Sequence, residues 1–477
     1  MIPVLLIVIP LLTGLVSFFL KEERSAKAFA LLSSVATLAV SLISLFQYGG
    51  SISADASWLP MLGSRYAVSL DGMGKLLTLL TAVSFPIIFA ATYNNKYKSP
   101  NAFYGYMLLT QAGLMGVFCS MDLLLFYFFW ELALIPTYFL CSKWGGERRI
   151  AVTFKFFVYT FLGSLLMLVG ILFVYYKTAD HSFSIASLQH LALTTGEENF
   201  IFWLFFIAFA IKMPVFPFHT WQPDTYEQAP TAVTMVLSGV MVKMGVFAVI
   251  RWLLPMFPLA SIRMADIIMI LAVSGMIYAS LIAIRQDDMK RLVAYSSIAH
   301  VGLMAASMFT GSSAGMQGVI YQMFAHGVNI IGLWIVIDVI EQQLGTRKFS
   351  ELGGLAQKAP TLAIMFVIMA LANIALPLTN SFVGEFLMFN SVFRHSPILA
   401  AVACISIILA AVYTLWMVQK VFYGEIRNEE RIALDVPVNT QLMLAILVAV
   451  VLIFGVYPQP MINLSSDTVS KIIAQIK

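Results

Sequence analysis

Six side chains that can gain or lose a proton lie inside long apolar stretches of this chain. They are Glu131, Lys212, Lys243, His300, His326 and Glu385. A charged group in the middle of a bilayer costs a few kcal/mol or more unless it is paired or hydrated, so such residues are functional candidates by default. Carboxyl, ammonium and imidazole groups share one chemistry, which is the transfer of protons. The pattern therefore predicts a proton pathway inside a membrane protein.

Two of these residues are natural partners. Glu131 stands in FYFFWELALIPTYFL and Lys212 in FFIAFAIKMPVFPFHTWQP. Each stabilises the charged form of the other if they lie close together. The alternative for Glu131 is a helix-end residue that reaches water, but the apolar run continues well beyond one helical turn on both sides.

The other four residues extend the predicted pathway. Lys243 lies between two glycines in GVMVKMG, where a neighbouring backbone can approach closely. A neutral imidazole accepts a proton on one nitrogen and donates one from the other, which suits His300 and His326 to a relay. The alternative for each histidine is a hydrogen-bonded packing role. Glu385 ends the series, and His219 is a candidate for proton entry at the cytoplasmic mouth.

The composition predicts a polytopic membrane protein. Of the 477 residues, 60% are hydrophobic and 11% are charged, whereas a soluble domain carries about a quarter charged residues. Apolar runs long enough to span a bilayer, about fourteen of roughly 20 residues each, recur along the whole chain. Neither a glycine-rich phosphate loop nor paired cysteines occur, so the sequence predicts no nucleotide, cofactor or metal site and no nucleic-acid partner.

The loops between the apolar runs alternate in charge. Most lysines and arginines fall in every second loop, at 21–27, 96–98, 143–155, 285–291, 347–358 and 420–431. The smaller set at the opposite end includes Arg65, Lys177, Arg251, Arg263, Arg394, Lys471 and Lys477. The positive-inside rule places the first set in the cytoplasm and both termini on the extracytoplasmic side.

Two spans contain prolines that must interrupt a helix. Pro214 and Pro217 follow Lys212, and Pro377 precedes Glu385. Proline removes a backbone donor and clashes with the preceding turn, so both spans should unwind there. Prolines that only kink packed helices are the alternative at either site.

The two breaks occupy matching positions. Each is the fourth of five spans, in the stretches 103–254 and 265–423, with 1–102 forming a three-helix segment before them and 424–477 a last helix and tail. An odd number of spans makes the second unit start from the opposite face, so two similar units would be inverted repeats. The predicted fold is therefore all-α, with about fourteen transmembrane helices and two inverted five-helix repeats.

Several of these blocks resemble the antiporter-like subunits of respiratory complex I and of Mrp antiporters. The resemblance covers nearly the whole chain and rests on LLLFYFFWELALIPTYFL, FKFFVYTFLGSLLML, FAIKMPVFPFHTWQPDTYEQAPTAVTMVLSGVMVKMG, DDMKRLVAYSSIAHVG and SFVGEF. Within the family, a carboxylate such as Glu385 in the second broken helix resembles the M type, whereas the L and N types carry lysine there. The chain also leaves no room for the long lateral helix of the L type.

The resemblance implies a function and roles for the residues. It implies a proton-translocating subunit of a bacterial NADH:quinone oxidoreductase in the inner membrane, beside L- and N-type subunits. Glu131 with Lys212 would be the switching pair, Lys243 the central relay, and Glu385 the terminal group toward the outside. NADH, FMN, iron–sulfur clusters and quinone would belong to other chains.

Three alternatives stay open from the residues. The first is an Mrp-type Na⁺/H⁺ antiporter subunit, which Glu385 disfavours. The second is the antiporter-like subunit of a membrane-bound hydrogenase or a related ferredoxin-driven complex. The third is a membrane spacer whose polar residues only fix helix packing, which predicts that Lys243→Met leaves proton transport intact.

Overall fold

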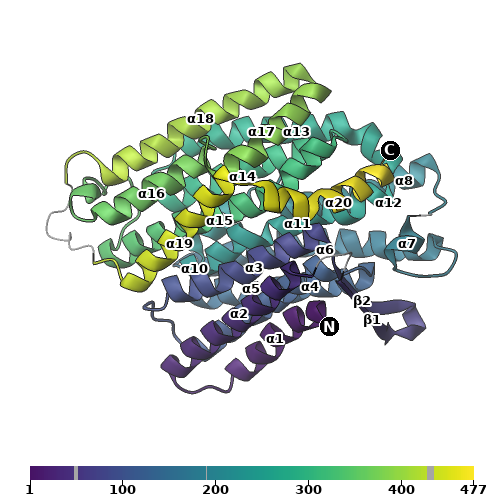
Figure 1. Cartoon of the computed structure of the whole chain (residues 1–477), viewed down its shortest axis with the longest axis horizontal. Coiled ribbons are helices and arrows are strands. Elements are labelled where there is room, and N and C mark those ends of the chain that lie inside the picture. Colours follow the sequence, from purple (N-terminus) through teal and green to yellow (C-terminus); the bar gives the residue numbers. More distant parts are fainter. Residues whose placement is uncertain (48–51, 190, 427–434, 477) are drawn as a thin grey trace.

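The chain folds into a bundle of long, roughly parallel helices with a small β-hairpin at one end (Figure 1). The computed structural model describes residues 1–47, 52–189, 191–426 and 435–476. Three residues used for the topology prediction, Arg427, Arg431 and Lys477, lie outside the described residues. Ten described helices are long and apolar enough to cross a membrane. Adding α1, α8, α14 and the interrupted α16–α17 pair to them gives the fourteen spans that the sequence predicts.

The N-terminal segment combines three helices with the hairpin. Its elements are α1 (Ile2–Ser17), α2 (Glu23–Leu45), β1 (Ile52–Leu59), η1 (Pro60–Leu62), β2 (Ser64–Leu70) and α3 (Gly72–Ala91). The antiparallel strands pair Ile52 with Leu70 and turn at Gly63, whose φ of 67° favours glycine. We call the end of the bundle that carries this hairpin the hairpin end, and both termini lie there (Figure 1). The sequence pattern did not predict the hairpin.

The next five spans contain the first break. They are built from α4 (Pro100–Cys119), α5 (Leu123–Trp144), α6 (Arg149–Lys177), α7 (Ile185–Leu188), α8 (Thr195–Lys212), α9 (Trp221–Gln228), α10 (Thr231–Val236), η2 (Leu237–Met241), α11 (Lys243–Ala248), η3 (Val249–Leu253) and α12 (Leu254–Met256). The interruption between α8 and α9 falls in the fourth span, as predicted. The segments η2 and η3 are π-helical, so the fifth span contains two wide turns.

The following five spans contain the second break. Their elements are α13 (Pro258–Ile284), α14 (Met289–Met308), α15 (Ser313–Leu344), η4 (Leu355–Gln357), α16 (Pro360–Asn373), α17 (Asn380–His395) and α18 (Pro397–Phe422). The last span is α19 (Val438–Val456), and α20 (Gln459–Ile476) follows it. The Gly72 N–H donates a hydrogen bond to the Thr468 hydroxyl of α20, and a Cβ at Gly72 would collide with the Leu464 carbonyl.

Local sequence explains where the helices begin. Proline opens α4, α13, α16 and α18, at a position where the missing N–H has no partner in any helix. Asp122, Asp288 and Ser312 cap the N-termini of α5, α14 and α15 by accepting main-chain hydrogen bonds. Short loops with such caps connect most spans directly.

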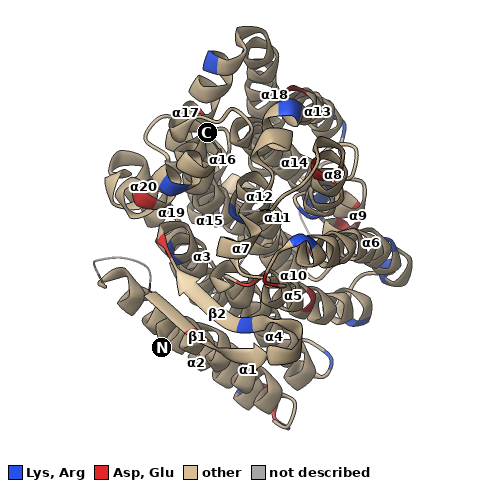
Figure 2. Ribbon diagram, turned by 90° about the vertical axis from the view of Figure 1, so that its right-hand side faces the viewer, with Lys and Arg blue, Asp and Glu red and all other residues tan. Residues whose placement is uncertain are grey.

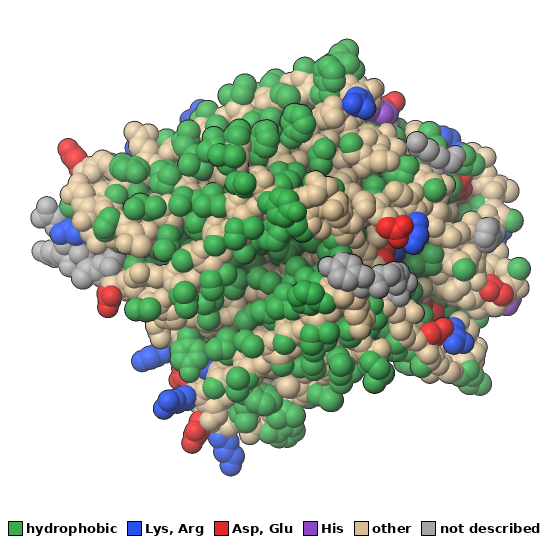
Figure 3. Space-filling view, viewed as in Figure 1, with side chains coloured by type: hydrophobic (Ala, Val, Ile, Leu, Met, Phe, Trp, Pro, Cys, Tyr) green, Lys and Arg blue, Asp and Glu red, His purple; other side chains and the backbone are tan. Residues whose placement is uncertain are grey.

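Charge and hydropathy divide the surface as a membrane protein requires. Seen from the hairpin end, charged positions are sparse along the ribbon (Figure 2). Hydrophobic side chains cover the middle of the face in Figure 3, and charged side chains gather toward its two ends. The lysine- and arginine-rich loops lie opposite the hairpin, at what we call the basic end. The most apolar stretches of α15 and of the α10–α12 span are fully buried at the centre.

Asp122 connects the hairpin to α5. Its Oδ1 accepts hydrogen bonds from the Ser64 hydroxyl and from the N–H groups of Leu124 and Leu125, and its Oδ2 accepts one from the Arg65 N–H. Burial raises the pKa of this carboxyl from its ordinary value, and these hydrogen bonds partly offset the effect. The hairpin is therefore held by a buried carboxylate rather than by a hydrophobic face alone.

Replacement Asp122→Ala is expected to loosen the hairpin. Losing a helix cap costs about 1–2 kcal/mol, which corresponds to roughly tenfold faster tryptic cleavage after Arg65 in the purified protein. Asp122→Asn keeps the Oδ1 acceptor and should protect this site nearly as well as the wild type. Equal cleavage of the alanine variant and the wild type would contradict this anchoring role.

Candidate functional site

The first break places Lys212 at the last turn of a helix inside the bundle. Helix α8 ends at Lys212 because Pro214 and Pro217 cannot continue its hydrogen-bond pattern. The Trp221 indole N–H donates a 3.0 Å hydrogen bond to the Ile211 carbonyl, which satisfies one acceptor that the break leaves free. The Lys212 side chain is 2% exposed. Irregular backbone of this kind at membrane depth needs protein or water around it, and here protein supplies the surroundings.

Lys212 and Glu131 are electrostatic neighbours without a direct ion pair in the described structure. The Lys212 ammonium lies 5.6 Å from the centre of the Trp130 ring and has no hydrogen-bond partner. Glu131 is part-buried and interacts electrostatically with Lys212, and its Oε1 has no hydrogen-bond partner among the described residues. The predicted contact is thus replaced by a cation–π interaction beside a nearby carboxylate. Its switching role stays a prediction.

Lys243 occupies the centre of the bundle between the two π-helical segments. It is 0% exposed. Its ammonium donates a 2.7 Å hydrogen bond to the Ser238 carbonyl in η2 and lies 2.8 Å from Nδ1 of His326. Wide turns of this kind leave carbonyl groups available to side chains and occur often at functional sites. Lys243 therefore contacts a second titratable side chain directly.

His326, His300 and Glu385 continue the line. The ring centres of the two histidines are 5.4 Å apart, and Nδ1 of His300 lies 2.9 Å from Oε1 of Glu385. Each of the three side chains is less than one-tenth exposed. The structure thus brings Lys243, His326, His300 and Glu385, from four different spans, into one buried row. Hydrogen bonds join Lys243 to His326 and His300 to Glu385, whereas the two histidines meet only ring to ring and their Nε2 atoms have no hydrogen-bond partner among the described residues. Ammonium, imidazole and carboxyl groups arranged in such a row have the chemistry to pass a proton.

The second break positions Glu385. Helix α16 ends at Asn373 and α17 begins at Asn380, and between them Ala375 and Leu378 adopt positive φ values of 55° and 73°. Non-glycine residues rarely adopt this conformation, which is found most often at functional sites. The break, around Pro377, starts α17 within the bundle, so that Glu385 faces α14 and α15.

Three further polar residues belong to this cluster and were not predicted from the sequence, namely Gln322, Asn329 and Ser381. Gln322 donates to Glu385 at 3.3 Å, and Asn329 donates to Ser381 at 2.7 Å. Gln322 and Asn329 flank His326 on α15 at spacings of four and three residues, so Gln322, His326 and Asn329 share one helix face. This spacing in the sequence could have identified Gln322 and Asn329 as neighbours of His326.

Gly245 allows the helix that carries Lys243 to pack closely against the first break. A Cβ at Gly245 would lie 2.7 Å from the Met213 nitrogen and 2.8 Å from the Phe209 carbonyl. Only glycine allows the two backbones to pack this closely. The structure therefore joins the Lys212 region to the Lys243 row through backbone packing, and no hydrogen bond between the two lysines occurs in the described chain.

The remaining candidate, His219, lies apart from this row. It is 2% exposed and packs its ring against Phe216 and Tyr278, at centroid distances of 5.7 and 5.2 Å. A cavity of about 680 Å³ opens separately at the basic end and includes Thr231, the first residue of α10, and the Lys290–Glu341 ion pair of 2.6 Å. His219 and the cavity that includes Thr231 are thus two separate places where polar groups lie between the basic end and the interior.

Comparison with known families decides what kind of protein this is. Residues 120–410 match the model of the NADH:quinone oxidoreductase/Mrp antiporter transmembrane family. The chain belongs to this family. The match includes both breaks and all six residues of the predicted pathway.

Individual members of the family align over almost their whole length. NADH-quinone oxidoreductase subunit M of Rhodobacter capsulatus is 37% identical over 94% of this chain and 91% of its own. F(420)H(2) dehydrogenase subunit M of Methanosarcina mazei is 34% identical over 99% of both chains. A chain of respiratory complex I from Thermus thermophilus superposes with a TM-score of 0.90 at 29% identity, covering 99% of this chain and all of that one. The all-α antiporter-like fold is thereby confirmed.

Proposed function

We propose that this chain is the M-type proton-translocating membrane subunit of a bacterial NADH:quinone oxidoreductase. The observation that carries the proposal is the buried row Lys243–His326–His300–Glu385, which joins titratable groups across the centre of the bundle. The M-subunit relatives support the assignment to this complex. Glu385 itself supports the M type rather than the L or N type.

The energy for pumping would come from the interaction of buried charges. Moving one charge against 100 mV requires about 2.3 kcal/mol. Removing one partner of a directly paired buried charge costs about 3–5 kcal/mol, so changes in buried charge interactions have the magnitude that pumping requires. Quinone reduction in other subunits would alter the interaction between Glu131 and Lys212, and the proton released by Lys212 would pass to Lys243. From there it would move through His326 and His300 to Glu385.

The proposed direction follows from the loop charges. The basic end faces the cytoplasm of the bacterial cell, and the hairpin end with both termini faces outward. Protons enter from the basic end, either beside His219 or through the cavity that contains Thr231. Glu385 delivers them toward the outside.

The chemistry of electron transfer belongs to partner chains in this proposal. NADH, FMN, iron–sulfur clusters and quinone bind there, and this chain holds no cofactor or metal. Its neighbours in the membrane are L- and N-type antiporter-like subunits. The chain is thus a non-redox part of a translocating enzyme.

A different electron donor is the second candidate. The F(420)H(2) dehydrogenase subunit matches over 99% of both chains, so this fold alone does not distinguish donors. Under that alternative the same proton row would operate beside a different electron-input module.

The composition and cation use of the intact complex test the proposal. Extraction in mild detergent should co-purify chains that oxidise NADH and carry flavin and iron–sulfur clusters. In proteoliposomes, NADH-driven proton uptake should not depend on Na⁺. A requirement for Na⁺ would support the Mrp-type alternative, and F(420)H(2)- or hydrogen-oxidising partner chains would replace the NADH assignment.

A further inference from the structure

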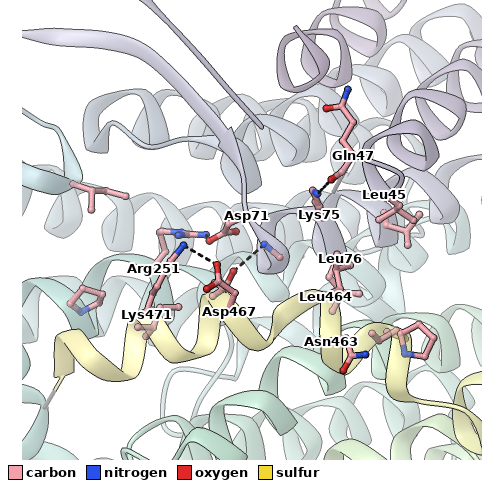
Figure 4. A pocket seen from close by; sticks show the side chains of 18 of the residues that line it. Leu45, Gln47, Asp71, Lys75, Leu76, Arg251, Asn463, Leu464, Asp467 and Lys471 are labelled. Atoms are coloured by element: carbon pink, nitrogen blue, oxygen red, sulfur yellow. Dashed lines mark hydrogen bonds and ion pairs between the residues drawn. The ribbon is translucent and has the colours of Figure 1, made fainter. Parts of the chain in front are cut away.

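A cavity of about 790 Å³ opens at the hairpin end between α2, α3 and α20 (Figure 4). Its charged lining consists of three cations and two anions, which are Lys75, Arg251, Lys471, Asp71 and Asp467. None of these residues belongs to the buried row of Lys243, His326, His300 and Glu385. In the figure, Lys75 and Arg251 face the cavity from above α20, which carries Asp467 and Lys471.

Lys75 is a buried cation without an anionic partner among the described residues. It is 6% exposed, and its ammonium donates a 3.1 Å hydrogen bond to the Gln47 carbonyl. The nearby Asp71 is already engaged, because it caps α3 through the Gly74 N–H and pairs with Arg251 at 2.6 Å. A buried ammonium in this position favours an additional anion.

Arg251 is a second cation on the wall of the same cavity. Its Nη2 pairs with Asp71, and its Nε is buried without a hydrogen-bond partner among the described residues. A guanidinium group has five donors in a planar fork that suits phosphate. Lys75 and Arg251 together therefore place two cations on one cavity wall, where Asp71 is the carboxylate paired with Arg251.

The rest of the cavity wall is apolar. It includes Leu76 and Leu79 of α3 and Met461, Leu464 and Ile472 of α20. Lys75 lies in the first turn of the α3 span, at the depth where lipid headgroups meet the hydrocarbon of a bilayer. A ligand that fits must therefore carry both a phosphate and a hydrocarbon chain.

We propose that this cavity binds an anionic phospholipid. The phosphate ester occupies the space between Lys75 and Arg251, and an acyl chain lies along α3 and α20. Lys471, on the exposed rim, contributes to the attraction while paired with Asp467 at 2.8 Å. Free inorganic phosphate shares the charged contacts but gains nothing from the apolar wall.

The test uses the intact complex in nanodiscs of phosphatidylcholine with or without phosphatidylglycerol. Native mass spectrometry of the released subunit measures the lipid that stays bound. The wild type should retain phosphatidylglycerol in preference to phosphatidylcholine. Lys75→Gln removes a charge-assisted hydrogen bond and should reduce the retained phosphatidylglycerol by about tenfold.

Two further variants make the result decisive. Lys471→Gln alters an exposed side chain that folding does not require, and it should lower retention about threefold even if Lys75→Gln fails to assemble. Arg394→Gln changes an exposed cation at the same end, outside the cavity, and should leave retention unchanged. Equal retention of both lipids, equal retention in the wild type and Lys471→Gln, or displacement of the lipid by an equal concentration of inorganic phosphate would overturn the proposal.

Discussion

Replacement Lys243→Met is expected to abolish or strongly reduce NADH-driven proton pumping in an assembled complex. Methionine has a similar length and suits an apolar interior, so packing at this fully buried position is largely retained. It cannot carry a proton and cannot interact with the His326 Nδ1, which lies 2.8 Å from the Lys243 ammonium. Loss of a positioned proton-transfer group lowers a rate by about 100-fold or more. Proton uptake into proteoliposomes measures the effect.

Two control variants separate charge from proton transfer. Lys243→Arg keeps the positive charge but does not release its proton, so it should also fail to pump. Met244→Leu changes the adjacent buried side chain and should pump normally. A Lys243→Met complex that assembles and pumps at the wild-type rate would favour the spacer alternative.

Replacement Glu131→Gln should have a comparably large effect on pumping. Glu131 interacts electrostatically with Lys212, whose buried ammonium has no hydrogen-bond partner among the residues that the structure describes. Removing the carboxylate leaves Lys212 without this anionic neighbour, so the proposed switch cannot operate and the complex becomes less stable. Proton uptake per NADH oxidised and the thermal stability of the complex are the two measurements.

A double variant tests the interaction itself. If Glu131 and Lys212 act on each other, Glu131→Gln combined with Lys212→Met should lose less thermal stability than the two single changes added together. Pumping should remain absent in the double variant. Glu147→Gln, at an exposed carboxylate of the basic end, is the matched control for the charge change. Additive stability losses and normal pumping would exclude the pair as a switch.

Hydropathy and proline placement predicted most of the architecture. Fourteen spans and two breaks could be predicted because a bilayer requires long apolar runs and because a proline inside a helix removes a hydrogen bond and kinks or breaks it. Proline alone is not decisive, since Pro10, Pro86 and Pro136 lie inside continuous helices. The hairpin could not be predicted, because apolar and polar residues alternate only weakly over residues 52–70. The hairpin is also held by Asp122, which lies in a distant part of the chain. The two π-helical segments beside Lys243 also lack a sequence signal, because a single wide turn does not change the apolar pattern of a fully buried span.

The candidate site was predicted as a set of residues rather than as a geometry. The burial of Glu131, Lys212 and Lys243 follows from their apolar surroundings. The packing of the helices decides which side chains touch. Lys243 and His326 are in direct contact, whereas Lys212 lies against the Trp130 ring and makes no direct contact with Glu131 among the described interactions. The functional role of each residue stays a prediction.

The glycine contact at Gly245 has a mechanical consequence. A Cβ on Gly245 would lie within 2.8 Å of the Met213 nitrogen, the Met213 Cβ and the Phe209 carbonyl, so the backbones pack here without the end of any flexible side chain among the nearest atoms. No rotamer change can absorb a displacement there, and closely packed interiors transmit strain. We therefore expect a small movement of the loop after Lys212 to displace the neighbouring segment, so that a change in the charge of Lys212 would alter the position of Lys243.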